Sequence, residues 1–302
     1  MNLQVKIKDA IFDNPVCVAS GTWSYEEKYS DAKKIRKLGA IIPKTFTLNR
    51  QQGNPPPRVA ETASGMINSI GIENEGADYF ISDKLPQLKK LRVPIILSIS
   101  GKTTDEFILL AEKLNSDGEI KGIEINLSCP NLGHKVLVAQ DARLTEETVT
   151  AVRKVSRHIL IAKLSPNVTD ITEIAKSAET AGADAVSLVN TFNALAIDIK
   201  TRKSKIGNIT GGLSGPAIKP AALYMVYKTR QAIRLPIIAM GGIADSADAL
   251  EFIIAGANMV AVGTASFLNP EAPLEVLSGI EKYMKENKIN NISALTGSLK
   301  TQ

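Results

Sequence analysis

Cys129 is the first residue whose type and position suggest chemistry. It follows Asn126 in the stretch GIEINLSCPN, directly before Pro130, which interrupts regular structure. A thiol there can act as a general base, although an unperturbed pKa of about 8.5 leaves little thiolate at neutral pH. Cys17 lies inside an apolar run, which favours a small core residue.

Lys163 ends another apolar run, in the stretch AKLSP. Its ammonium can stabilise negative charge on an electron-rich ring, as a reduced flavin requires. It can also form a Schiff base, as in barrel aldolases that bind a phosphate. The residues around Lys163 leave both chemistries open.

Two glycine turns suggest a site for an anion. One lies in MGGIADSADA, with Gly241 and Gly242, and the other in VGTASF, with Gly263 and Thr264. Each turn leads from an apolar run into a helical pattern. Backbone N–H groups at such turns and at the following helix N-terminus form a phosphate cradle.

The elements that position these residues recur along the whole chain. Short apolar, β-branched runs alternate with helical patterns, which is typical of a parallel sheet buried on both faces. We expect eight strands, at Val16–Ser20, Ala40–Lys44, Pro94–Ile99, Gly122–Leu127, Ile159–Leu164, Ala183–Val189, Pro236–Met240 and Asn258–Gly263. Eight βα units in 302 residues predict an α/β fold of the (β/α)8 TIM-barrel type, as a single domain over residues 1–302.

Local signals support the expected helices. Thr103 and Glu106 have the spacing of a capping box. Gly39, Gly182 and Gly256 each stand before an alanine and a strand, where we expect left-handed helix caps. We also expect inserted hairpins and long βα loops at the C-terminal face, with one hairpin turning at Lys205 to Asn208 and a lid from Pro130 to Leu144.

In such a barrel the chemistry lies at the carboxyl ends of the strands. Two lysines, two asparagines and a cysteine stand at these ends, and they are costly to bury unless paired. A polar site is therefore expected there. The strand-end residues are Ser20, Lys44, Thr45, Ser98, Asn126, Cys129, Lys163, Asn190, Thr191, Gly241, Gly242, Gly263 and Thr264.

Composition excludes several other classes of protein. Two cysteines and two histidines cannot supply a disulfide framework, a four-cysteine iron–sulfur cluster or a paired-cysteine zinc site, so no metal is expected. The net charge of +5 comes from scattered lysines, which favours solvated helix faces over a nucleic-acid surface. The sequence contains no apolar run of about 18 residues, the length that a membrane span requires, so we expect a cytoplasmic protein.

Longer motifs identify a family. They are GNPPPRVAETASGMINSIGIEN at 53–74, NLSCPN at 126–131, KLSPNVTDI at 163–171, TRKSKIGNITGGLSGPAIKP at 201–220 and MGGI at 240–243. On these motifs the chain resembles the class 1 dihydroorotate dehydrogenases over nearly its whole length. The stretch at 201–220 and the form VAETASGM are more similar to the NAD-linked class 1B catalytic subunit than to the fumarate-using class 1A enzyme.

The resemblance implies FMN-dependent oxidation of (S)-dihydroorotate to orotate in pyrimidine biosynthesis. Cys129 would remove the C5 proton while the C6 hydride passes to flavin N5. The residues implied for FMN are Ser20, Lys44, Thr45, Asn126, Lys163, Val189, Gly215, Gly241, Gly242, Gly263 and Thr264. Those implied for the substrate are Lys44, Asn68, Ser69, Ile70, Gly71, Ile72, Asn126, Asn190 and Thr191.

The resemblance to class 1B enzymes also implies that the chain needs a partner subunit. The resemblance implies an iron–sulfur flavoprotein that carries FAD and a [2Fe–2S] cluster and passes electrons to NAD, around a homodimeric catalytic core in a heterotetramer. This agrees with the cysteine count and with the lack of a GxGxxG nucleotide fingerprint. Two positions depart from the family pattern: Ala194-Leu195 replaces a glycine-methionine pair, and Ser98 replaces an asparagine.

Alternative functions would differ in electron acceptor, substrate or cofactor. A fumarate-dependent class 1A enzyme would use another electron acceptor, and a related dihydropyrimidine dehydrogenase would use another substrate. A phosphate-sugar aldolase or isomerase, or a non-catalytic scaffold, would hold no flavin.

Overall fold

Eight parallel strands form a closed barrel in this computed structural model, which describes residues 1–23, 32–128 and 137–300. Each strand falls within or across the segment predicted for it, so the (β/α)8 barrel is confirmed. The strands are β3 (Val16–Val18), β4 (Ala40–Ile41), β7 (Ile95–Ile99), β8 (Ile120–Asn126), β9 (Ile159–Lys163), β10 (Ala185–Leu188), β15 (Ile237–Ala239) and β16 (Met259–Val262). They follow one another around the ring in chain order, and β16 pairs with β3 to close it.

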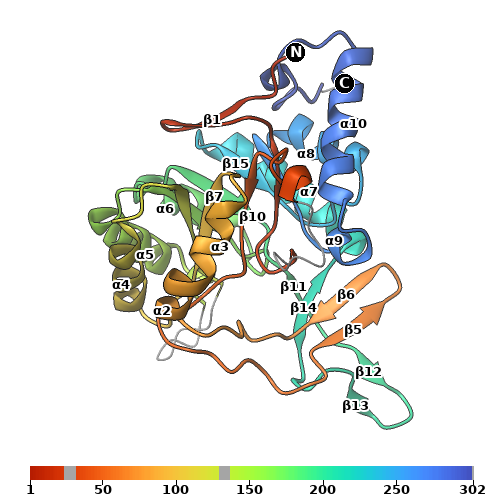
Figure 1. Cartoon of the computed structure of the whole chain (residues 1–302). Coiled ribbons are helices and arrows are strands. Elements are labelled where there is room, and N and C mark those ends of the chain that lie inside the picture. The colour runs from red at the N-terminus through yellow and green to blue at the C-terminus, as the bar shows by residue number, and fades with distance from the viewer. Residues whose placement is uncertain (24–31, 129–136, 301–302) are drawn as a thin grey trace.

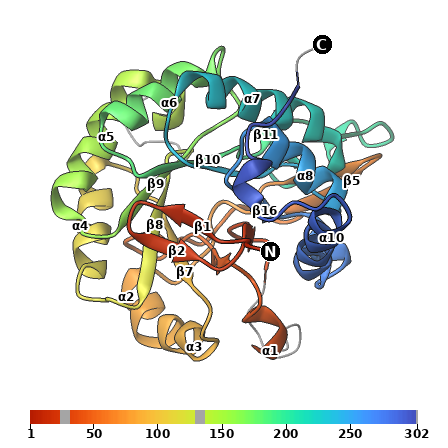
Figure 2. The same ribbon diagram turned by 90° about the horizontal axis from the view of Figure 1, so that it is seen from above.

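Helices surround the barrel, as Figures 1 and 2 show. The long ones lay an apolar stripe on the strands, as α4 does by burying Phe107, Leu110 and Leu114. The helices are α1 (Ala32–Ile35), α2 (Ala77–Tyr79), the π-helical η1 (Phe80–Lys84), α3 (Leu85–Lys90), α4 (Thr104–Leu114), α5 (Ala142–Val155), α6 (Ile171–Thr180), α7 (Lys219–Ala232), α8 (Ser246–Ala255), α9 (Ala265–Leu268) and α10 (Ala272–Glu286). Within the described ranges, no helix combines the length and apolar character that a bilayer span requires.

The cap predicted for α4 is half confirmed. The Thr103 side chain accepts a hydrogen bond from the N–H of Glu106 at 3.2 Å. The Glu106 carboxylate accepts from the N–H of Lys102 at 2.7 Å, one residue earlier than a capping box requires. Both groups still satisfy backbone donors at the start of the helix.

The predicted glycine caps have two different causes. Gly182 and Gly256 have φ of +88° and +129°, as expected for glycine at a helix end. Gly39 is not left-handed, so that prediction was wrong. A Cβ at Gly39 would lie 2.1 Å from the carbonyl oxygen of Asn14, which makes close backbone approach the reason for this glycine.

The barrel interior has an apolar lower part and a polar upper part. Ile96, Ile161 and Ala185 point inward with Cys17, and the hairpin of β1 (Val5–Ile7) and β2 (Ala10–Phe12) covers them from the N-terminal end. Figure 2 shows this hairpin lying across the barrel. Cys17 is fully buried and its Sγ donates to the carbonyl oxygen of Val260 at 3.4 Å, so the predicted core role is confirmed. Burial raises the pKa of the Cys17 thiol.

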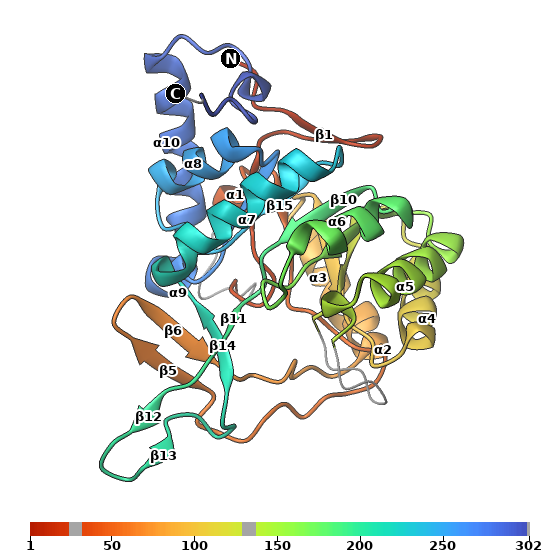
Figure 3. The ribbon, with the colours of Figure 1, turned by 180° about the vertical axis from the view of Figure 1, so that it is seen from behind.

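Inserted strands build a second sheet on the opposite side of the molecule from that hairpin (Figures 1 and 3). β5 (Val59–Thr62) and β6 (Gly65–Asn68) pair with β11 (Phe192–Ala194) and β14 (Gly211–Ser214) in the antiparallel order β11-β14-β6-β5. Two segments about 150 residues apart in the chain therefore share one sheet. In the departing pair, Ala194 ends β11, and Leu195 directly after it is exposed.

The hairpin predicted in the second insertion is present, but its turn was misplaced. β12 (Ile197–Asp198) pairs with β13 (Lys203–Ser204), so the chain reverses over residues 199–202 and not at 205–208. The Asp198 carboxylate accepts from the N–H of Lys200 at 2.9 Å and from Thr201 Oγ1 at 3.0 Å. These bonds from the Asp198 side chain stabilise the turn over residues 199–202.

Candidate active site

Polar side chains from neighbouring strands meet at the carboxyl end of the barrel. Asn126 and Lys163 are register partners at the ends of β8 and β9. The Asn190 side-chain amide donates to Asn126 Oδ1 at 3.4 Å, although 64 residues separate them. The structure thus brings together three of the residues predicted from strand ends.

Lys44 follows β4 and is held partly buried. Burial lowers the pKa of its ammonium, the nearby Glu73 carboxylate raises it, and the Arg58 guanidinium lowers it further. Among the described residues no acceptor pairs with Lys44. A partly desolvated cation without a protein acceptor is suited to an anionic ligand.

The segment from Asn68 to Ile72 lies beside the Asn190–Thr191 segment. The Asn68 side chain donates to the carbonyl oxygen of Gly212 at 3.3 Å, and a Cβ on Gly212 would lie 1.9 Å from Thr191 Oγ1. Ser69 is buried, and its Oγ accepts from Asn54 Nδ2 at 2.8 Å. The backbone N–H of Asn54 donates to the carbonyl oxygen of Ile70 at 3.0 Å. The second sheet therefore carries this predicted substrate segment to the barrel end.

Ile72 adopts an unusual backbone conformation in this segment. Its φ is +50°, which is an outlier for a β-branched residue and costs about 1 to 3 kcal/mol. Asn74 holds it in place, because Asn74 Nδ2 donates to the carbonyl oxygen of Ile72 at 2.7 Å and to Thr47 Oγ1 at 3.0 Å. Gly71, with φ of +73°, completes the turn. Strain held by its surroundings is common where a chain contacts a ligand.

Asn167 is a positioning residue that the sequence analysis missed. Its side chain donates to the carbonyl oxygen of Thr191 at 3.0 Å and accepts from the N–H of Asn193 at 2.8 Å. The carbonyl oxygen of Asn167 accepts from Gln140 Nε2 at 2.8 Å. An asparagine directly after Pro166 in KLSPN was a detectable turn signal, but its partners are distant in the chain.

The glycines predicted for phosphate binding lie close together. Gly241 and Gly242 have φ of +127° and +80°. A Cβ on Gly242 would lie 2.9 Å from the carbonyl oxygen of Gly215, and one on Gly215 would lie 3.5 Å from Thr264 Cγ2. A Cβ on Gly241 would lie 3.2 Å from Val189 Cγ2.

The N–H groups of this turn cluster are available to a ligand. Within the described chain, the backbone N–H groups of Gly241, Gly242, Gly263 and Thr264 donate to no protein acceptor. Thr264 Oγ1 donates to Ser214 Oγ at 2.9 Å, which joins the last barrel strand to the second sheet. Free N–H groups on turns that exclude side chains fit a phosphate.

The start of α8, which we expected to add to this cradle, carries its own capping carboxylates. The Asp245 carboxylate accepts from the N–H of Asp248 at 3.0 Å. The Asp248 carboxylate accepts from the N–H groups of Ala244 and Asp245 at 2.9 and 3.3 Å. These carboxylates place negative charge at the helix N-terminus, which disfavours a bound anion there.

Two predicted features fall wholly or partly outside the described residues. Cys129 lies outside them, as does 130–136 of the expected lid. The lid was also predicted too long, because α5 begins at Ala142 and the Asp141 side chain caps it. Val138 and Ala139 are already buried before that helix.

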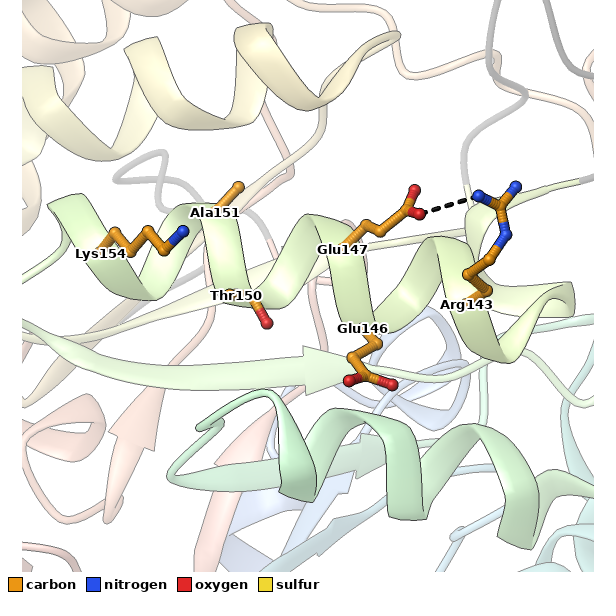
Figure 4. Close-up of a pocket in the computed structure, with 6 residues that line it drawn as sticks. All are labelled: Arg143, Glu146, Glu147, Thr150, Ala151 and Lys154. Atoms are coloured by element: carbon orange, nitrogen blue, oxygen red, sulfur yellow. Dashed lines mark hydrogen bonds and ion pairs between the residues drawn. The ribbon is translucent and has the colours of Figure 1, made fainter.

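A hollow on the outer surface carries no comparable arrangement. Figure 4 shows its six lining residues, all from α5, with Arg143 paired to Glu147 at 2.9 Å. Exposed pairs four residues apart on a helix contribute little energy. The site with convergent groups is therefore the barrel end.

Comparison with known proteins agrees with this geometry. The family model described as dihydroorotate dehydrogenase matches residues 2–284. The chain belongs to the dihydroorotate dehydrogenase family. It is 47% identical over 299 residues to the "Dihydroorotate dehydrogenase B (NAD(+)), catalytic subunit" of Desulforamulus reducens, covering 99% of this chain and 98% of that protein. It is 48% identical over 299 residues to the protein of the same name from Alkaliphilus oremlandii, covering 99% of each.

The residues at the strand ends come from several of the motifs that resemble this family. The glycine turns, Lys163 and the Asn126–Asn190 pair come from motifs spread over more than 100 residues, and the barrel collects them at one end. The same end holds Ser20, Thr45 and Ser98, whose hydroxyls form a continuous chain. Ser20 Oγ lies 2.9 Å from Thr45 Oγ1, which lies 2.8 Å from Ser98 Oγ.

Proposed function

We propose that the chain is the FMN-binding catalytic subunit of an NAD-linked dihydroorotate dehydrogenase, and that it oxidises (S)-dihydroorotate to orotate in pyrimidine biosynthesis. The observation that carries this proposal is that free glycine-turn N–H groups and the buried Lys163 lie at the same end of the barrel. A phosphate cradle and a buried cation at one barrel end suit a phosphorylated flavin. Full-length similarity to proteins with that name supports the choice of substrate.

The FMN site we propose comprises the glycine turns and the polar barrel end. The turns bind the phosphate through backbone N–H groups, and Lys163 provides positive charge near the ring system. When bound, FMN supplies a ring that accepts a hydride. The proposed FMN residues are Ser20, Lys44, Thr45, Asn126, Lys163, Val189, Gly215, Gly241, Gly242, Gly263 and Thr264, within one domain over residues 1–302.

Dihydroorotate has groups that match the remaining side chains. Its carboxylate suits Lys44, whose ammonium has no acceptor among the described residues. Its cyclic ureide presents donors and acceptors in one plane, which the Asn126 and Asn190 amides can match. The proposed substrate residues are Lys44, Asn68, Ser69, Ile70, Gly71, Ile72, Asn126, Asn190 and Thr191.

Cys129 is our candidate general base, three positions after the end of β8 in the sequence. Its thiolate would take the C5 proton while the C6 hydride leaves for the flavin, which balances the two-electron oxidation to orotate. Lys163 and Lys44 place positive charge at the barrel end. Positive charge there favours an anionic substrate and a ring that gains negative charge.

We further propose that electrons leave through a partner subunit that carries FAD and a [2Fe–2S] cluster and that reduces NAD. The chain has two cysteines, too few to bind such a cluster through four thiolates. The printed names of its relatives include the words "catalytic subunit". We propose a homodimeric core flanked by two partner subunits, and a cytoplasmic location.

Spectroscopy of the purified chain tests the proposal. The chain should show flavin absorption near 450 nm, the general flavin signature, which anaerobic dihydroorotate bleaches. Reoxidation by an artificial dye, but by neither NAD nor fumarate, supports a subunit that requires its partner. Reoxidation by fumarate would assign it to class 1A, and bleaching by dihydrouracil in place of dihydroorotate would change the substrate. A colourless chain that cannot be reconstituted with FMN would overturn the proposal.

A further inference from the structure

Glu124 is an ionisable residue at the centre of the barrel that no step above uses. It lies on β8, and its side chain is 0% exposed. Among the described residues it is the one aspartate or glutamate in the buried class. A buried carboxylate costs several kcal/mol unless its partners satisfy it. Its position between Ile123 and Ile125 in GIEINL was a signal that the sequence analysis did not use.

Three side chains from three strands satisfy this carboxylate. Ser98 Oγ, from β7, donates to Oε1 at 3.0 Å, and Ser187 Oγ, from β10, donates to Oε2 at 2.8 Å. Lys163 Nζ, from β9, lies 3.5 Å from Oε1, with its side chain 6% exposed. Glu124 therefore fixes the ammonium that we assign to the flavin ring.

The carboxylate also sets the direction of a chain of hydroxyl groups. A carboxylate only accepts, so the single proton of Ser98 points to Glu124. The contact of 2.8 Å between Thr45 and Ser98 must then use the Thr45 proton. The contact of 2.9 Å between Ser20 and Thr45 must likewise use the Ser20 proton. Ser20, the one partly exposed member, is left with lone pairs to offer outward.

We propose that Glu124 is a positioning residue that sets the hydrogen-bonding polarity of the cofactor pocket, with a donor cation at Lys163 and an acceptor at Ser20. This inference rests on the proposed FMN site. A flavin ring carries both an N–H donor and acceptor atoms that gain negative charge on reduction, so it matches this polarity. The role extends to Ser98, which is buried and transmits the orientation from Glu124 to Thr45.

The two serines on Glu124 provide a matched pair of variants. Ser98→Ala and Ser187→Ala each remove one hydroxyl donor from the same carboxylate. Ser98→Ala also breaks the chain and frees the Thr45 and Ser20 protons to reorient. Ser187→Ala leaves the chain from Ser20 to Glu124 intact.

Comparing the FMN affinities of these two variants tests whether Glu124 positions the hydroxyl chain or only stabilises the fold. We would dilute the flavin-loaded chain and measure the fluorescence of released FMN to obtain Kd, and measure thermal unfolding in parallel. Ser98→Ala should weaken FMN binding about tenfold, the equivalent of about 1.4 kcal/mol, while Ser187→Ala stays within about twofold of the parent. Equal FMN affinities for the two variants would overturn the proposal, whatever their unfolding temperatures.

Glu124→Gln tests the charge that Glu124 places beside Lys163. The substitution leaves the Lys163 charge unbalanced, so the midpoint potential of bound FMN should become more positive. Asp184→Asn is the control, because Asp184 pairs with Arg153 at 2.8 Å just before β10, at the other end of the barrel. Both variants should unfold at lower temperature, and an unshifted potential in Glu124→Gln would contradict the role. If the parent chain itself binds no FMN, the proposed function fails, which this comparison distinguishes from failure of the Glu124 inference.

Discussion

Replacement of Gly242 by alanine should both destabilise the chain and weaken FMN binding. Gly242 has φ of +80°, and left-handed backbone costs an L-residue about 1 to 2 kcal/mol. The added Cβ would lie 2.8 Å from the backbone nitrogen of Lys219 and 2.9 Å from the carbonyl oxygen of Gly215. Neither backbone atom can move cheaply, and overpacking of this kind costs about 1 to 3 kcal/mol. The free energy of unfolding should therefore fall by about 2 to 5 kcal/mol.

Two control glycines separate the contributions. Gly21 has φ of +79° but nothing within 4 Å of a built Cβ, so Gly21→Ala should cost about 1 to 2 kcal/mol from backbone strain alone. Gly118 has neither a positive φ nor a close neighbour, so Gly118→Ala should stay within about 0.5 kcal/mol of the parent. Thermal unfolding of the flavin-free chains, followed by circular dichroism, measures the order. At about 2 to 4 °C per kcal/mol, Gly242→Ala should unfold at least about 4 °C below the parent. If Gly242→Ala unfolds at the same temperature as Gly118→Ala, our reading of this turn is wrong.

Three further variants address catalysis and substrate binding. Cys129→Ser should slow dihydroorotate oxidation well beyond threefold, and turnover within about threefold of the parent across pH 6 to 9 would remove Cys129 as the base. Lys44→Gln should raise KM for dihydroorotate at least tenfold, since a charge-assisted contact contributes about 1.5 to 3 kcal/mol. Because burial lowers the pKa of Lys44, the parent should lose substrate affinity as pH rises through that lowered pKa, and Lys44→Gln should lack this loss. Asn167→Ala leaves the carbonyl oxygen of Thr191 and the N–H of Asn193 without their partner, so KM should rise and stability fall by about 1 to 3 kcal/mol. Asn193→Ala keeps its backbone bond, and an equal loss there would show that Asn167 does not act through these contacts.

The sequence by itself determined the elements and most of the strand-end chemistry. Apolar runs of strand length between helical patterns fixed eight strands, because a parallel strand buried on both faces must be apolar along its length. The same rule made Lys163 and Asn126 conspicuous, since polar residues at strand ends need partners. Local backbone demands were also readable, as at Gly182 and Gly256, where a helix ends in a left-handed residue.

Local signals failed where a distant group decides the outcome. Gly39 looks like a helix cap, but the reason for this glycine is the approach of the Asn14 carbonyl from another part of the chain. The turn after β12 depends on the Asp198 side chain, which outweighed the signal at residues 205–208. The expected anion site at α8 is occupied by carboxylates of its own capping residues, including Asp248.

Tertiary structure alone decided which polar groups act together. Ser98, Glu124 and Ser187 belong to strands β7, β8 and β10, and they meet because the barrel closes with a particular stagger. Pairing of β14 with β6 brings the Asn68 segment beside Thr191. Pairing between distant strands depends on register and closure, which no window of sequence contains. The chain therefore specifies its strands locally, and the geometry of its site arises only when the barrel closes.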